Sequence, residues 1–222
     1  MSVFCLNISF SQNYEIGVFA GGSNLISDVG STNYIAPNRL AFGGIIKWNR
    51  SPRHSFRASL IYSSIEASDS QSDDPRRVER NYSYKNNSFV EFSAGLEFTF
   101  FDFNLHMSSS QYTPYLYTGI SIAHHDNYYF RNGEQRSEST SSFAYGIPMV
   151  LGFKFTLSEY LILGAEIGVR YTFSDEIDGS TPDSENLVEQ YSFGNTNNND
   201  WYTFTGITLT YTFGRKPCYT CF

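Results

Sequence analysis

The sequence lacks the features that usually identify helical membrane proteins and nucleic-acid binders. It has no run of about 18 consecutive apolar residues, which excludes an ordinary membrane-spanning helix. Basic residues are few, with 15 Lys and Arg against 22 Asp and Glu, and the net charge of −7 argues against a nucleic-acid partner. Only 2 Trp and 3 Cys occur in 222 residues, whereas Tyr and Phe number 17 and 20. A single domain rich in these two aromatic residues is expected.

Strict alternation of side chains marks the segment WYTFTGITLTYTF, residues 201–213. Successive residues of a strand point to opposite faces. One face is apolar in its middle and aromatic at its ends, and it carries Trp201, Thr203, Thr205, Ile207, Leu209, Tyr211 and Phe213. The other face is mostly threonine and glycine. An apolar band with aromatic ends is typical of a strand that faces lipid, with its rings at the two headgroup levels.

The same alternation returns along the rest of the chain, and it predicts seven further strands. They are expected near residues 14–22, 39–49, 56–63, 89–100, 113–123, 143–155 and 161–173. Long polar loops are expected at 23–38, 66–87, 126–141 and 175–199, and they alternate with short turns at 49–53, 101–112 and 157–159. The sequence therefore predicts an all-β fold, an eight-stranded antiparallel transmembrane β-barrel of the outer-membrane type. Both termini are expected in the periplasm and the long loops outside the cell.

Charged residues of the predicted strands fall on the face opposite the apolar one. They are four acids and four bases: Glu15, Glu91, Glu97, Glu166, Lys47, Arg57, Lys154 and Arg170. A soluble lipocalin-like barrel would have its apolar residues inside instead. Eight strands enclose a space that their own side chains can fill, and opposite charges inside it can pair. We expect a side-chain-filled lumen with a charge network rather than a pore, and Glu166 and Arg170 are expected to form one buried pair.

The two ends of the chain are predicted to lie outside the barrel, which spans residues 12–213. Residues 1–11, MSVFCLNISFS, are similar to the end of a secretory signal peptide cut after Ser11, although the basic n-region is missing; the alternative is a disordered extension. Residues 214–222 are expected to form a periplasmic tail, because Pro217 cannot continue strand pairing.

The predicted tail combines basic, aromatic and thiol side chains. Its candidate partner-binding residues are Arg215, Lys216, Cys218, Tyr219 and Cys221. Arginine and aromatic side chains are the usual anchors of interfaces. In an oxidising periplasm the two thiols are expected to form a disulfide, either with each other or with a partner chain. The alternative is an inert flexible tail, as termini often are.

No pattern in the sequence predicts an enzyme, a cofactor or a metal site. A hydrolase needs a nucleophile within hydrogen-bond reach of a base. His54 and His106 fall in short turns, whereas His124 and His125 are strand neighbours that point to opposite faces and are expected to be polar residues of the membrane interface. The last long loop is acidic but lacks the spacing of a calcium loop, so solvated surface is expected for Asp175, Glu176, Asp178, Asp183 and Glu185.

Segments from both ends and the middle of the chain resemble the PorG family. They are YEIGVFAGGSNLISDVGSTNYIAPNRLAFGGIIKWN, FVEFSAGLEFTFF, TPYLYTGI and GNTNNNDWYTFTGITLTYTFGRKPCY. PorG is the small outer-membrane barrel subunit of the type IX secretion system of Bacteroidetes-type bacteria. The second cysteine of the tail, Cys221, departs from the CYC spacing that the family leads us to expect.

The resemblance implies a non-catalytic role in protein export and, in gliding species, motility. The barrel would hold the periplasmic ring, built by the lipoprotein PorK and its partner PorN, against the outer membrane. Outer-membrane lipid would surround the wall. The alternative is a stand-alone surface barrel, an adhesin or small-solute channel, that acts through its long loops.

Overall fold

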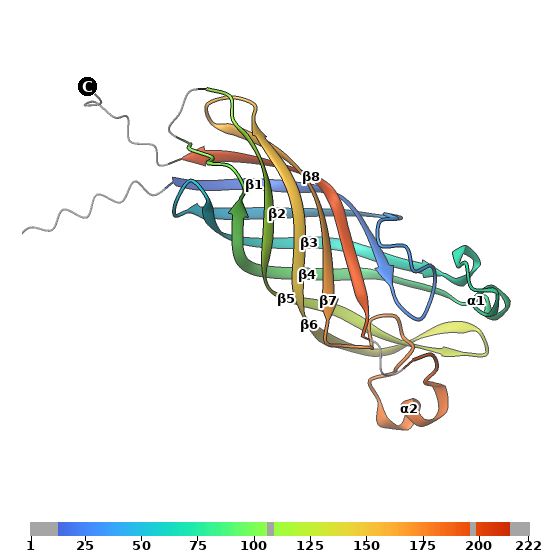
Figure 1. Ribbon diagram of the computed structural model, residues 1–222. Helices are drawn as coiled ribbons and strands as arrows, with labels where there is room; N and C mark the ends of the chain where they lie inside the picture. The colour runs from blue at the N-terminus through green and yellow to red at the C-terminus, as the bar shows by residue number, and fades with distance from the viewer. Residues whose placement is uncertain (1–12, 106–108, 196–198, 214–222) are drawn as a thin grey trace, which may run out of the picture.

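Alternating side chains build eight strands in the computed structural model, which describes residues 13–105, 109–195 and 199–213. The strands are β1 (Asn13–Ile26), β2 (Arg39–Asn49), β3 (His54–Ser68), β4 (Ser83–Thr99), β5 (Tyr112–Arg131), β6 (Glu134–Thr156), β7 (Leu161–Thr172) and β8 (Trp201–Phe213). Each strand pairs with its sequence neighbours, and β1 pairs with β8 to close the barrel (Figure 1). Within the described ranges, no helix has both the length and the apolar character needed to cross a bilayer.

The burial of side chains follows the predicted period of two. In β2, Leu40 and Phe42 are 69% and 53% exposed, whereas Ala41 between them is fully buried. The register keeps this order around the wall, because outward Ile16 is opposite outward Ile46 and inward Glu15 is opposite inward Lys47. Apolar residues therefore face outward and charged residues inward, and the prediction of an eight-stranded barrel of the outer-membrane type is confirmed.

Several strands extend beyond their predicted ends on one side of the barrel. β1 continues to Ile26, because residues Ser23 to Ile26 pair with the start of β8. The predicted loop at 126–141 is wrong: these residues form a β-hairpin between β5 and β6, paired down to Arg131 and Glu134. Its turn is Asn132-Gly133, and both residues have positive φ, 55° and 83°. A two-residue turn of this kind matches the twist of paired strands and needs no loop.

The two ends of the barrel differ in their connections. The long connections carry a 3₁₀ turn (Asp69–Gln71), α1 (Pro75–Arg80) and α2 (Glu185–Tyr191) at one end. The opposite end has the short connections after β2, β4 and β6, and there β1 begins and β8 ends (Figure 1). We call these the long-loop end and the short-turn end.

Candidate functional site

The eight charged residues that the sequence places inward all lie in the barrel interior. None is more than 4% exposed. Glu97 lies between two ammonium groups, with its carboxylate oxygens 2.7 Å from Lys47 Nζ and 2.7 Å from Lys154 Nζ. Such charge-assisted contacts offset the cost of burying each ion.

Two arginines complete the network through paired bonds to carboxylates. Arg57 donates to both oxygens of Glu166 at 2.7 and 2.8 Å. Arg170 donates to both oxygens of Glu91 at 3.0 and 3.2 Å. The expected pair of Glu166 with Arg170 is therefore wrong. Four residues of one strand span about 13 Å, so each side chain meets a partner from another strand instead.

Neutral donors, two of them tyrosines, also bind the network's carboxylates, and the sequence pattern does not predict which residues these are. Tyr115 and Tyr202 donate their hydroxyls to Glu166 and Glu91 at 2.7 and 2.6 Å. Glu15 accepts from the neutral donors Asn49 Nδ2 and Thr210 Oγ1 at 2.9 and 2.8 Å. The signal for these partners is their position on the inward face, but the period of two does not distinguish them from other inward residues.

The short-turn end of the lumen is covered by the connection between β4 and β5. Phe103 and Leu105 are about 5% and 4% exposed and pack against Ile162 of β7. Lys154 Nζ lies 4.8 Å from the centre of the Phe103 ring, so the cover also contacts the charge network. This connection was predicted as a plain turn, but its described residues Phe103 and Leu105 are buried at the barrel opening.

The long-loop end is closed by a cap of packed aromatic rings. Tyr82 and Phe193 come from the connections before β4 and after α2, Phe130 comes from the β5–β6 hairpin, and the Tyr82 and Phe130 rings stack with centroids 4.6 Å apart. The guanidinium of Arg80 lies 4.9 Å from the Tyr82 ring and 4.8 Å from the Phe193 ring. Its N–H edge is held by Asp69, which accepts from Arg80 Nε at 2.7 Å. The cap joins these two connections and the β5–β6 hairpin into one packed unit.

Buried aspartates tie the connections of the cap together. Asp178 is fully buried and accepts hydrogen bonds from the backbone N–H groups of Asp28, Val29 and Ser180 at 3.0, 3.2 and 2.7 Å. The prediction that this acidic loop is solvated surface is wrong for Asp178, because its carboxylate satisfies loop N–H groups that would otherwise be buried without partners.

Burial also changes the acidity of this cluster. It raises the pKa of Asp175 to about 7, and although the Thr181 hydroxyl opposes the shift, the charges of Asp178 and Asp28 add to it. Burial likewise raises the pKa of Asp178, and it raises the pKa of Asp200 well above the ordinary value. Among the described residues, no group of three or more His, Cys, Asp or Glu side chains is arranged to hold a metal ion.

The histidines lie in different surroundings. His54 begins β3, and its Nδ1 is 3.1 Å from Ser51 Oγ. His124 packs on the Phe143 ring at 5.1 Å, but His125 is fully buried. The expectation that both are interfacial is wrong for His125, because the alternation of β5 turns it inward. His106 lies outside the described residues.

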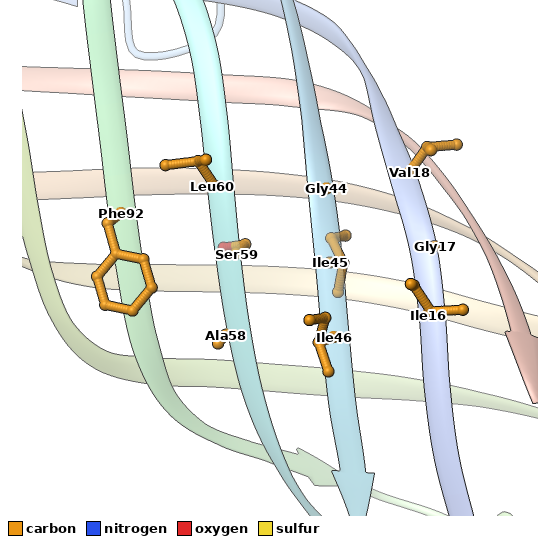
Figure 2. A pocket seen from close by; sticks show the side chains of 10 residues that line it. All are labelled: Ile16, Gly17, Val18, Gly44, Ile45, Ile46, Ala58, Ser59, Leu60 and Phe92. Carbon is orange, nitrogen blue, oxygen red and sulfur yellow. The ribbon is translucent and has the colours of Figure 1, made fainter.

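The outer wall has an apolar hollow across β1 to β4. Its volume is about 530 Å³, and Figure 2 shows Ile16, Val18, Ile46, Leu60 and Phe92 around Gly44. Gly44 creates the hollow, since a Cβ at this position would meet no atom within 4 Å. The hollow belongs to the outward apolar face, and the hydroxyl of Ser59, which also lines it, is buried and paired with the Ser93 hydroxyl at 2.8 Å.

The predicted signal segment and tail lie outside the described residues. This applies to residues 1–11 and to Arg215, Lys216, Cys218, Tyr219 and Cys221. Their roles stay predictions, as does any disulfide through the tail.

Comparison with known proteins gives a family and a set of similar barrels. Residues 1–222 match the family model described as Domain of unknown function (DUF6089). No curated protein matches the sequence. A major outer membrane protein from Thermus thermophilus is 12% identical, with a TM-score of 0.48 over 91% of this chain and 99% of that chain. Ail, the attachment invasion locus protein of Yersinia pestis, is 10% identical, with a TM-score of 0.44 over 90% of this chain and 98% of that chain.

Proposed function

The chain belongs to the DUF6089 family, and we propose that this member is a non-catalytic outer-membrane barrel that anchors a periplasmic protein complex. The observation that carries the proposal is the closed interior. The lumen is filled by ion pairs, Phe103 and Leu105 cover one end, and the aromatic cap covers the other. Among the described residues the filled lumen leaves a substrate no path through the barrel, so the proposed role lies with its outer surfaces.

The apolar outward face supports a location in the outer membrane. Large apolar side chains are exposed on the outward face of all eight strands, including Val18, Leu60, Phe92, Ile120, Leu151 and Ile207. A soluble protein seldom exposes so large a continuous apolar surface, whereas lipid would cover it. The alternation of long and short connections supports an orientation with the short-turn end in the periplasm.

The resemblance to the PorG family supplies the proposed partner. On this proposal the short-turn end and the tail bind the ring lipoprotein PorK and its partner PorN in the type IX secretion system. Arg215, Lys216 and Tyr219 would make the contacts, and Cys218 and Cys221 would allow a disulfide to a partner.

A stand-alone surface-binding barrel is the second candidate. The packed cap favours it, because an ordered surface at the long-loop end can recognise an external partner. The filled lumen argues against the channel version of this alternative.

Truncation of the tail distinguishes the two candidates. Deletion of every residue after Gly214 should leave a folded, membrane-inserted barrel that no longer supports export by the secretion system. Changing Cys218 and Cys221 to Ser should weaken export, and non-reducing gels would show whether a partner-linked species disappears. Full secretion at normal barrel levels would contradict a role for the tail.

A further inference from the structure

A polar pocket at the long-loop end has no role in the proposed anchoring. Its volume is about 390 Å³, and it is lined by Asp28, Asp74, Arg76, Arg77, Arg80, Gly194 and Asn195. These residues come from the connection after β1, from α1 and its N-cap residue Asp74, and from the segment that follows α2. A volume of this order lies within the range of small-molecule sites, about 300–1,000 Å³.

The walls of the pocket are fixed by contacts within the cap. Arg80 donates to Asp69 and to the backbone oxygen of Asp28, both within 2.9 Å. Asp28 Oδ2 accepts from Asn195 N at 2.6 Å. Gly194 has φ of +83°, and a Cβ there would lie 2.1 Å from Asp28 Oδ2, so only glycine permits this approach. Fixed walls reduce the ordering cost of binding a ligand.

Two of the arginines keep their charge available to a ligand. Arg77 Nη1 donates to the neutral carbonyl oxygens of Ser27 and Gly30 at 2.9 Å each, and its Nη2 lies 3.9 Å from Asp28 Oδ1. The Arg76 side chain is 90% exposed, and its Nε and Nη2 donate to the two carboxylate oxygens of Asp74 at 3.3 and 3.1 Å in solvent. Exposed pairs of this kind contribute little, so a ligand anion can replace Asp74.

We propose that this pocket binds a small saccharide that carries one anionic oxygen group, a phosphate or a carboxylate. The planar guanidinium groups of Arg76 and Arg77 match the oxygens of such a group. The carboxylates of Asp28 and Asp74 accept hydrogen bonds, as sugar hydroxyls require. The same two carboxylates repel a ligand with many negative charges, so the pocket selects a single anionic group.

Titration of the full chain, refolded in detergent micelles, tests the proposal with defined probes. Glucose 6-phosphate and glucuronate should each bind saturably in calorimetry, and neutral glucose should not bind. Inorganic phosphate should bind more weakly than glucose 6-phosphate, because it lacks the hydroxyls. Arg76→Gln should weaken binding of the anionic sugars about tenfold, the effect of losing one charge-assisted partner.

Arg136→Gln is the matched control. Arg136 is an exposed arginine that also pairs with an acid two residues away, Glu134, but it does not line the pocket. This variant should bind the probes as the unchanged chain does. Because the Arg76 side chain is exposed, Arg76→Gln should have the gel mobility of the folded barrel. This gel measurement is the control for the folding of the variant. The proposal would be overturned if glucose bound as well as the anionic sugars, or if either anionic sugar failed to bind. It would also be overturned if phosphate bound as well as glucose 6-phosphate, or if folded Arg76→Gln bound the probes as the unchanged chain does.

Discussion

Single carboxylates hold the interior of this barrel together. Glu97 pairs with two lysines from different strands, and Glu166 binds Arg57, which is far away in the chain. A carboxylate that is buried beside two cations stabilises the fold through its opposite charge, because a buried cation without a counter-charge carries an uncompensated desolvation cost.

Glu97→Gln should destabilise the barrel by about 3–5 kcal/mol, because it leaves Lys47 and Lys154 without their shared counter-charge. Guanidinium unfolding in lipid vesicles would measure the loss. Glu185→Gln, the same change on exposed α2, should have no effect. The double variant Glu97→Gln with Lys154→Met should recover part of the lost stability. If Glu97→Gln were as stable as the unchanged barrel, the network would have no stabilising role.

Asp175 should make the cap less stable as pH rises from about 4 to about 7. Its pKa is raised to about 7 in the folded chain, chiefly by burial, while an unfolded aspartate titrates near pH 4. The folded state therefore holds the extra proton across this window, and its stabilising effect is lost as pH approaches 7. Hydrogen exchange of residues 175–195, corrected for intrinsic rates, would measure this, and Asp175→Asn should flatten the profile. A cap that tightens over the same pH range would contradict the assignment.

The inward position of each charged residue could be predicted from the sequence, but its partner could not. The period of two places Glu166 and Arg170 on the same face. Whether Glu166 meets Arg170 or Arg57 depends on the tilt and closure of the sheet, which bring residues 109 positions apart into contact. The tyrosines that donate to Glu166 and Glu91 could not be predicted for the same reason.

At the level of elements, the β5–β6 hairpin shows what a local signal can specify. Asn-Gly between two alternating segments is a strong hairpin signal, and the polar composition of residues 126–141 obscured it. The loops that carry α1 and α2 are different. Their closed positions depend on long-range contacts such as Arg80 with Phe193, which no local pattern reveals.

Gly133→Ala should loosen this hairpin while leaving the barrel intact. Gly133 has φ of 83°, and its added Cβ would meet only Tyr82 Cε1 at 3.9 Å, so the penalty is backbone strain of roughly 1–2 kcal/mol. Hydrogen exchange should rise within residues 126–141 only. Asn132→Gly, which relieves a positive φ, is the tolerated control. Unchanged exchange in Gly133→Ala would show that the turn does not set the hairpin.

The outward face of β4 should reject a charge. Leu96 is 39% exposed on the apolar wall, and Leu96→Arg should lower the stability of the inserted barrel by about 2–4 kcal/mol if this face contacts lipid. Folding yield into vesicles, read from heat-modifiable gel mobility, would measure the effect. Val78→Arg on exposed α1 adds the same charge outside the wall and should fold normally. Normal folding of Leu96→Arg would contradict the lipid-facing assignment.

At the scale of the whole molecule, the barrel is closed at both ends and filled between them. Phe103 and Leu105 cover the short-turn end, and the cap around Arg80 covers the other. The outward wall offers lipid a largely apolar surface. A molecule built in this way has two places to meet other proteins, and the proposed anchoring assigns the complex to the short-turn end.

Site-specific photo-crosslinking in intact cells tests that assignment most directly. A photoreactive residue would replace Ser158, exposed between β6 and β7, or Val188, exposed on α2 at the long-loop end. The account predicts that the Ser158 probe captures a component of the periplasmic ring and that the Val188 probe captures none. Capture of ring components from Val188, with none from Ser158 in equally abundant barrels, would contradict the account.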